Sequence, residues 1–141
     1  MDEILRIVPM VLYFIIGLIS LFMAIKNFFS KSFLPFHEKA AEKTWNELED
    51  PLKLLILTFM RITGLGFLVL AILLLVFPVV NYYHPTAFYN YLIPVIALLY
   101  CFGLYLINYS LYKKTKANTP WKGSLYAMFM ITIGIIISIL N

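Results

Sequence analysis

The sequence has a single cysteine and few charged residues, and these two shortages exclude much of protein chemistry. Cys101 has no second cysteine to pair with, so the chain forms no intramolecular disulfide, no thiol redox pair and no cysteine-based metal site. Charged residues make up 13% of the chain, about half their share in soluble domains, whereas hydrophobic residues make up 62%. This composition indicates an integral membrane protein.

Acidic residues are missing from every long apolar run. The seven carboxylates lie at the N-terminus or just before the second run, at Asp2, Glu3, Glu38, Glu42, Glu47, Glu49 and Asp50. A proton-driven exporter of the small multidrug kind depends on a buried Glu in its first helix, so we rank that class low. The sequence also has no phosphate-binding loop, HExxH motif, nucleophile elbow or carboxylate pair for hydrolysis. We therefore expect no catalytic residue, no metal and no cofactor.

Four apolar runs are long enough to cross a bilayer, because a hydrocarbon core of ~30 Å needs ~20 helical residues. The predicted spans cover about residues 4–26, 52–78, 87–112 and 120–140, which leaves no room for a soluble domain. The prediction is an all-α, four-helix transmembrane bundle, a single domain over residues 1–141. Lysines gather in the first and third connections, while Arg6 is the one cation on the other side. The positive-inside rule then places the protein in a plasma (bacterial inner) membrane with both termini outside.

The segment between the first two runs is too polar to cross the membrane but has a helical pattern. If Pro35 begins a helix, then His37, Ala41 and Trp45 fall at intervals of four residues on one face. Lysines and acids occupy the opposite face. This pattern predicts a short amphipathic helix over residues 35–49 that lies along the cytoplasmic interface, with its tryptophan at headgroup depth.

Arg61 interrupts the second apolar run, and two interpretations fit it. Counting ~20 residues back from Val80 puts the inner hydrocarbon boundary near Arg61, whose guanidinium then snorkels to lipid phosphates. If instead Lys53 lies at the surface, Arg61 sits ~12 Å deeper. A charge at that depth costs at least ~2.5 kcal/mol and needs a polar interior or a ligand. Gly64 and Gly66 follow directly and would let a neighbouring backbone or a lipid headgroup approach.

The third run has the most polar interior of the four. Tyr105, Asn108 and Tyr109 share a helix face, and Asn108 lies five residues before Lys113, or ~7 to 8 Å into the inner leaflet. That depth matches the depth of Arg61. Aromatic residues at a span end are also typical of an interfacial belt, which is the alternative interpretation for Tyr109.

These residues together place a cation, an imidazole, an amide and phenols at the cytoplasmic leaflet. Such a half-apolar setting suits an anionic amphiphile, such as a phospholipid headgroup, a fatty acid or an isoprenoid phosphate. The candidate ligand-binding residues are His37, Trp45, Arg61, Gly64, Tyr105, Asn108 and Tyr109. The leading hypothesis is a non-catalytic membrane protein that binds a lipid or small amphiphile there, with an accessory or regulatory subunit as one form of it.

Two other functions stay open at this point. One is an oligomeric small-molecule transporter or channel, because four spans enclose little pathway on their own. The other is a small membrane enzyme of lipid metabolism that uses His37 as a general base. The expected partners are membrane lipids, together with further copies of the chain or a larger membrane protein. Nucleic acid is not expected, because the basic residues cluster at the ends of the spans.

Three short motifs occur in order between residues 36 and 67. They are F-H at Phe36, W-x-x-L from Trp45 and R-x-x-G-x-G from Arg61 to Gly66. This order resembles a group of small four-helix bacterial membrane proteins of uncharacterised function. The resemblance covers about a quarter of the chain. It implies a fold of four spans and draws attention to His37, Trp45, Arg61, Gly64 and Gly66, but it implies no activity.

Overall fold

The computed structural model describes residues 2–140, without the side chains of residues 2–5 and 87–89, and contains only helices and connecting turns in that range. The elements are α1 (Asp2–Phe28), α2 (Pro35–Ala41), the short 3-10 helix η1 (Trp45–Glu47), α3 (Asp50–Tyr83), α4 (Ala87–Thr115) and α5 (Trp121–Leu140). Four of them, α1, α3, α4 and α5, are long and apolar enough to cross a membrane. The predicted all-α four-helix membrane bundle is confirmed, and residues 1 and 141 of the predicted domain lie outside the described range.

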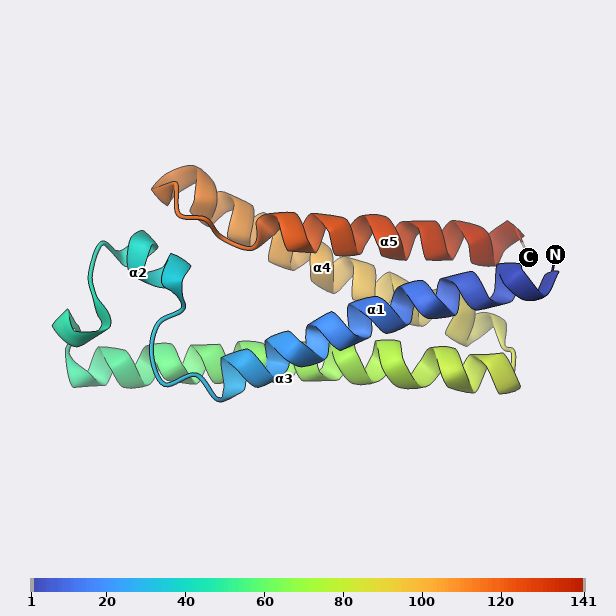
Figure 1. Cartoon of the computed structure of the whole chain (residues 1–141), viewed down its shortest axis with the longest axis horizontal. Coiled ribbons are helices and arrows are strands. Elements are labelled where there is room, and N and C mark those ends of the chain that lie inside the picture. The colour runs from blue at the N-terminus through green and yellow to red at the C-terminus, as the bar shows by residue number, and fades with distance from the viewer. Residues whose placement is uncertain (1, 141) are drawn as a thin grey trace.

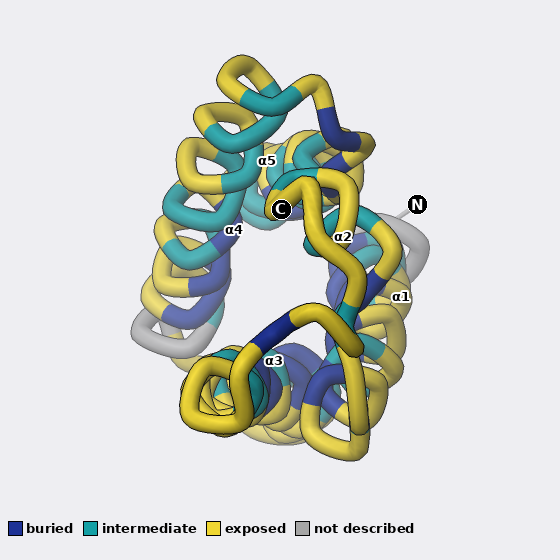
Figure 2. Tube along the Cα trace, turned by 90° about the vertical axis from the view of Figure 1, so that its left-hand side faces the viewer, coloured by how far each residue is buried: buried dark blue, intermediate teal, exposed yellow. Residues whose placement is uncertain are grey.

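The four long helices form two pairs, α1 with α3 and α4 with α5 (Figure 1). The start of α1, the end of α5 and the turn between α3 and α4 lie at one end of the molecule, which we call the terminal end. The other end carries α2 and η1, and we call it the α2 end. The two pairs meet toward the terminal end and diverge toward the α2 end, where α2 lies beside the opening and against α4 (Figures 1 and 2).

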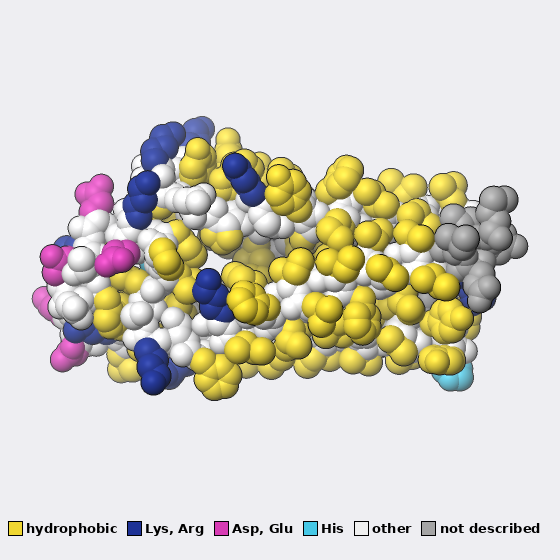
Figure 3. Space-filling model, viewed as in Figure 1, with side chains coloured by type: hydrophobic (Ala, Val, Ile, Leu, Met, Phe, Trp, Pro, Cys, Tyr) yellow, Lys and Arg dark blue, Asp and Glu magenta, His cyan; other side chains and the backbone are white. Residues whose placement is uncertain are grey.

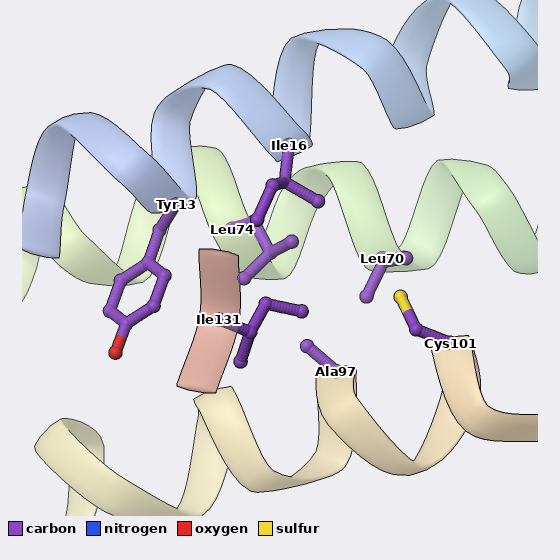
Figure 4. Close-up of a cluster of buried hydrophobic side chains, with 7 residues drawn as sticks. All are labelled: Tyr13, Ile16, Leu70, Leu74, Ala97, Cys101 and Ile131. Atoms are coloured by element: carbon purple, nitrogen blue, oxygen red, sulfur yellow. The ribbon is translucent and has the colours of Figure 1, made fainter. Parts of the chain in front are cut away.

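A small apolar cluster joins the two pairs where they meet (Figure 4). Every long helix contributes to it, and its members are Tyr13, Ile16, Leu70, Leu74, Ala97, Cys101 and Ile131. The outward-facing side chains are apolar too, and Phe22 and Phe129 are about two-thirds exposed, at 65% and 67%. Figure 3 shows this as an apolar surface between the charged α2 end and the terminal end. A helical bundle that is apolar on both its inside and its outside is suited to lipid, not water.

Glycine allows the α1 and α3 backbones to approach closely. A Cβ added to Gly64 would lie 3.1 Å from the Ala24 carbonyl oxygen and 3.1 Å from the Phe28 backbone nitrogen. Ser20 and Ala24 on the facing side of α1 are both buried, at 4% exposure. Small residues at such a crossing replace side-chain packing with direct backbone contact, which is a common way to join helices in membranes.

The segment predicted as one helix over residues 35–49 is divided in the structure. Helix α2 begins at Pro35 as expected but ends at Ala41, and Glu42 adopts a left-handed conformation with φ of 51°. The Thr44 backbone N–H then donates to the Glu47 carboxylate at 2.6 Å and caps the new turn η1. This cap competes with continuation of α2, because it provides a hydrogen-bond acceptor for the Thr44 backbone N–H at the start of a new turn.

The four long helices also differ in their bounds from the predicted spans, and α3 differs most. Helix α3 continues through Pro78 to Tyr83, so its 34 residues extend ~51 Å, well beyond a ~30 Å core. Proline inside a helix removes one backbone hydrogen bond and bends the helix, but neighbouring spans allow it to continue. Helix α5 begins at Trp121, and just before it the Thr119 hydroxyl donates to the Asn108 backbone carbonyl oxygen at 2.8 Å.

Candidate functional site

The structure places the seven predicted ligand-binding residues in three groups at the α2 end. The first group contains His37 and Trp45, which share the Phe33 ring at centroid distances of 6.0 and 5.2 Å. Phe36 packs on the other side of His37 at 4.1 Å. The His37 Nδ1 atom is buried without a hydrogen-bond partner among the described residues, and burial lowers the pKa of its imidazole. No described group therefore orients His37 as a general base would require.

The second group contains Arg61 and Gly64 on α3. Gly64 is buried against the α1 backbone. The sequence allowed either a neighbouring backbone or a lipid headgroup to approach this glycine, and in the structure the backbone does. Arg61 lies one turn away, is exposed, and has no hydrogen bond or ion pair to a described side chain. Because Gly64 packs on the last turn of α1, Arg61 lies near the level at which α1 ends.

The third group is an aromatic cluster on α4 and α5. Tyr105 and Tyr109 stack at 5.5 Å with an interplanar angle of 13°, and Trp121 contacts both rings at 6.3 and 5.5 Å. Asn108 lies on the same turn; its amide donates to the Leu104 carbonyl oxygen at 2.9 Å, while its own carbonyl oxygen accepts the Thr119 hydroxyl. The three residues therefore share one face of α4, as helical spacing predicts. The same face also packs against the start of α5.

Between these groups the two helix pairs stand apart. Figure 3 shows the surface hollowed here, between α1 below and α5 above, with basic side chains (dark blue) above and below the hollow. The lysines at the ends of α1, α4 and α5 and in the loops beside them are all exposed, at Lys26, Lys31, Lys113, Lys114, Lys116 and Lys122. We call this the α2-end opening. Hydrophobic side chains lie around it, and basic side chains lie at its edge (Figure 3).

A shallow depression on α2 and η1 offers a different surface. It is lined by mixed charges and no large apolar side chain, at Pro35, Glu38, Lys39, Glu42, Lys43, Thr44 and Glu47. Such a surface does not match an apolar chain.

A deeper cavity lies at the terminal end, and the sequence analysis missed it. Its volume is about 280 Å³. All four long helices and the α3–α4 turn line it, through Arg6, Pro9, Met10, Tyr13, Leu74, Phe77, Pro78, Asn81, Tyr82, Pro85, Asn90, Tyr91, Ile93, Pro94 and Ser138. We call it the terminal-end cavity.

The signal for this cavity was present in three prolines. Pro9, Pro78 and Pro94 lie inside α1, α3 and α4 and all line the cavity. Each lacks a backbone N–H and prevents the helix from closing tightly at that turn. Counting from the span ends places all three prolines at the same end of the bundle.

Polar side chains of the terminal-end cavity form a partly satisfied network. The Asn81 amide donates to the Asn90 side-chain oxygen, and the Asn81 oxygen accepts the Thr86 backbone N–H at 3.2 Å. The Tyr91 hydroxyl donates to the Ser138 carbonyl oxygen at 3.3 Å. The Tyr13 hydroxyl is buried next to the Ser138 side chain, but no hydrogen bond of normal geometry joins them.

The apolar cluster of Figure 4 lies between the terminal-end cavity and the α2-end opening. Leu74 and Ile131 at its centre are 0% exposed, so they separate the two spaces in this conformation. The molecule thus has one candidate site at each end. Comparison with protein-family models, curated proteins and solved structures finds no match to this chain.

Proposed function

We propose that this membrane protein binds the headgroup and upper acyl chain of an anionic amphiphile, a phospholipid in the first instance, in the α2-end opening. The observation that carries the proposal is the divergence of the α1–α3 and α4–α5 pairs beneath α2. An acyl chain is accommodated between apolar helix faces, and the headgroup then lies at the cationic edge. Binding of this kind needs no catalytic residue.

Charge supports the same location. Ten of the eleven cationic side chains belong to the α2 end, from Lys26 onward, against five of the seven acids. Each basic residue near an anionic leaflet contributes about 1 kcal/mol of attraction. By the positive-inside rule, we infer that the α2 end faces the cytoplasm and that both termini lie outside the plasma membrane.

Arg61 gives the proposal its phosphate ligand. Arg61 lies one helical turn from the Gly64–Ala24 contact, and the residue is exposed. A guanidinium at this depth reaches lipid phosphates and can bind two of their oxygens at once. This combines the two interpretations of the sequence: Arg61 lies at the hydrocarbon boundary and its ligand is a headgroup.

Native mass spectrometry of the gently solubilised protein tests the proposal. The wild type is compared with Arg61→Gln and with Arg6→Gln, a matched loss of one guanidinium at the opposite end. Each sample is incubated with phosphatidylglycerol or with phosphatidylcholine of the same chains. We expect a discrete phosphatidylglycerol adduct that falls about tenfold in Arg61→Gln, as for one charge-assisted contact of ~1.5 kcal/mol, and persists in Arg6→Gln. Equal adducts from both lipids, or equal loss in both variants, would overturn the proposal.

A second candidate function is favoured by one observation. The terminal-end cavity and the α2-end opening lie at opposite ends, with only the cluster around Leu74 and Ile131 between them. Opening at one end while the other closes would give alternating access, and an oligomer of the chain would complete the pathway. Uptake of a solute into vesicles by the reconstituted wild type, lost in Ile131→Trp, would support a transporter. A clean monomer without uptake would exclude it.

A further inference from the structure

The terminal-end cavity is separate from the α2-end opening. We infer that it binds a carboxylate carried on a small apolar body. The inference rests on the size of the cavity, on the donors that face it and on a lining without an acid among the residues whose side chains the structure describes. It does not depend on lipid binding at the other end.

Size limits the ligand to a small molecule. A cavity of ~150 Å³ in another protein holds benzene, and this cavity has a volume of about 280 Å³. A ring or a short chain with a polar headgroup fits that space, whereas a whole phospholipid does not. Leu74 and Ile93 are buried in its wall, at 0% and 6% exposure, and provide an apolar surface for the body of the ligand.

The polar groups of the cavity include hydrogen-bond donors that a ligand can use. The Tyr13 residue is 6% exposed, and its hydroxyl is buried without a hydrogen bond of normal geometry. A buried hydroxyl without a partner is unfavourable, so an incoming acceptor atom would stabilise it. In the Asn81–Asn90 pair both side-chain oxygens already accept hydrogen bonds, which leaves amide N–H groups for a ligand.

Arg6 supplies the charge. Its guanidinium lies 5.9 Å from the Tyr82 ring centroid, and both residues line the cavity. The aromatic face holds the cation without neutralising it, and no described lining residue is a carboxylate that would compete for it. A carboxylate is the anion that matches this set, because it accepts from a guanidinium and from a hydroxyl or amide at once.

Isothermal titration of the whole protein in micelles with sodium benzoate tests the inference, with blank micelles subtracted. Benzamide, which has the same shape without the charge, is the matched ligand control. Two variants remove one donor each: Arg6→Gln, and Tyr13→Phe, which keeps the ring. Their matched controls are Arg61→Gln at the α2 end and Tyr126→Phe, an exposed tyrosine of α5. Thermal unfolding without ligand verifies that each variant is folded.

We expect benzoate to bind more tightly than benzamide and to lose about tenfold in affinity in Arg6→Gln and in Tyr13→Phe, with no loss in the two controls. Equal affinity for benzoate and benzamide would overturn the inference, and so would equal effects of cavity and control variants. Competition with palmitate then identifies the source of the carboxylate. Displacement of benzoate indicates a membrane fatty acid, and its failure indicates a soluble acid. The phosphatidylglycerol adduct at the α2 end serves as a separate readout, so the two sites can fail independently.

Discussion

The Tyr13 ring of α1 lies directly against the α5 backbone at Gly134. A Cβ built on Gly134 would stand 2.6 Å from the Tyr13 Cε1 atom and 2.8 Å from its hydroxyl oxygen. This contact joins α1 to α5 where the two helix pairs meet, and it places the phenol at the wall of the terminal-end cavity. Packing of the bundle and geometry of the cavity therefore depend on the same two residues.

Replacing Gly134 with alanine should destabilise the bundle by about 1–3 kcal/mol, because the Tyr13 ring must move or the helices must separate. Gly103→Ala is the control, since nothing lies within 4 Å of a Cβ at Gly103. There, alanine should be neutral or stabilise α4 by up to ~1 kcal/mol. Unfolding of each variant in mixed micelles gives the free energies. Equal effects of the two substitutions would mean that the Tyr13 contact does not hold the pairs together.

Gly64→Ala should also destabilise the bundle by about 1–3 kcal/mol. Here the nearest neighbours are backbone atoms of Ala24 and Phe28, which cannot rotate away as a side chain can. Phosphatidylglycerol binding per folded molecule should stay unchanged, because Gly64 faces α1 and not the lipid. Native mass spectrometry and unfolding on one preparation measure both quantities. Lost binding at unchanged stability would instead make Gly64 a headgroup contact.

Acid should loosen the α2 segment. Burial lowers the pKa of His37 below its usual value, so the released segment, in which the pKa is near ~6.5, binds more protons than the packed one. The stabilisation is complete above about pH 6.5 and is lost as the pH falls toward the lowered pKa. Glu47 does not titrate in this window, because the Thr44 backbone hydrogen bond lowers its carboxylate pKa. Hydrogen exchange of residues 34–48, corrected for intrinsic rates, should rise between pH 7.5 and 5.5.

The matched pair for this effect is His37→Gln and His84→Gln. His84 lies exposed at the terminal end. The first substitution should remove the pH dependence of exchange in residues 34–48, and the second should preserve it. The same dependence in both variants would mean that His37 is not its source.

The proposed orientation predicts a labelling pattern in intact cells. In a Cys101→Ala background, a cysteine at position 84 should react with a membrane-impermeant maleimide from outside. A cysteine at position 32, in the exposed loop after α1, should react only after permeabilisation. The reverse pattern would place the α2 end outside and contradict the charge argument.

The four spans were predictable because length and hydropathy alone decide which segments can cross a bilayer. The break after Ala41 was not, since it depends on a left-handed Glu42 and on competition from the Thr44–Glu47 cap. The sequence predicts that the second span ends at Pro78, whereas α3 continues to Tyr83. A sequence does not show which neighbouring helices support a helix beyond a proline.

The sequence predicts at which level along the helices the candidate residues lie, but it does not predict which of them come together in one pocket. Tyr105, Asn108 and Tyr109 share a face by helical spacing alone, and the structure retains it. Whether that face meets Arg61 depends on how helices pair, and α3 pairs chiefly with α1. The terminal-end cavity is lined by all four long helices, so its shape depends on how they pack together, which the sequence does not show.

Fluorescence quenching by brominated lipid tests the central claim most directly. Both tryptophans of the chain, Trp45 and Trp121, lie at the α2 end, whereas the terminal-end cavity has none. The protein is reconstituted in phosphatidylcholine with increasing brominated phosphatidylglycerol, and Trp45→Phe and Trp121→Phe report the two positions separately. The account predicts saturable quenching of Trp121 at low mole fraction of brominated phosphatidylglycerol, weakened in Arg61→Gln and not in Arg6→Gln. Quenching that rises only in proportion to the bulk lipid, equally in both arginine variants, would contradict it.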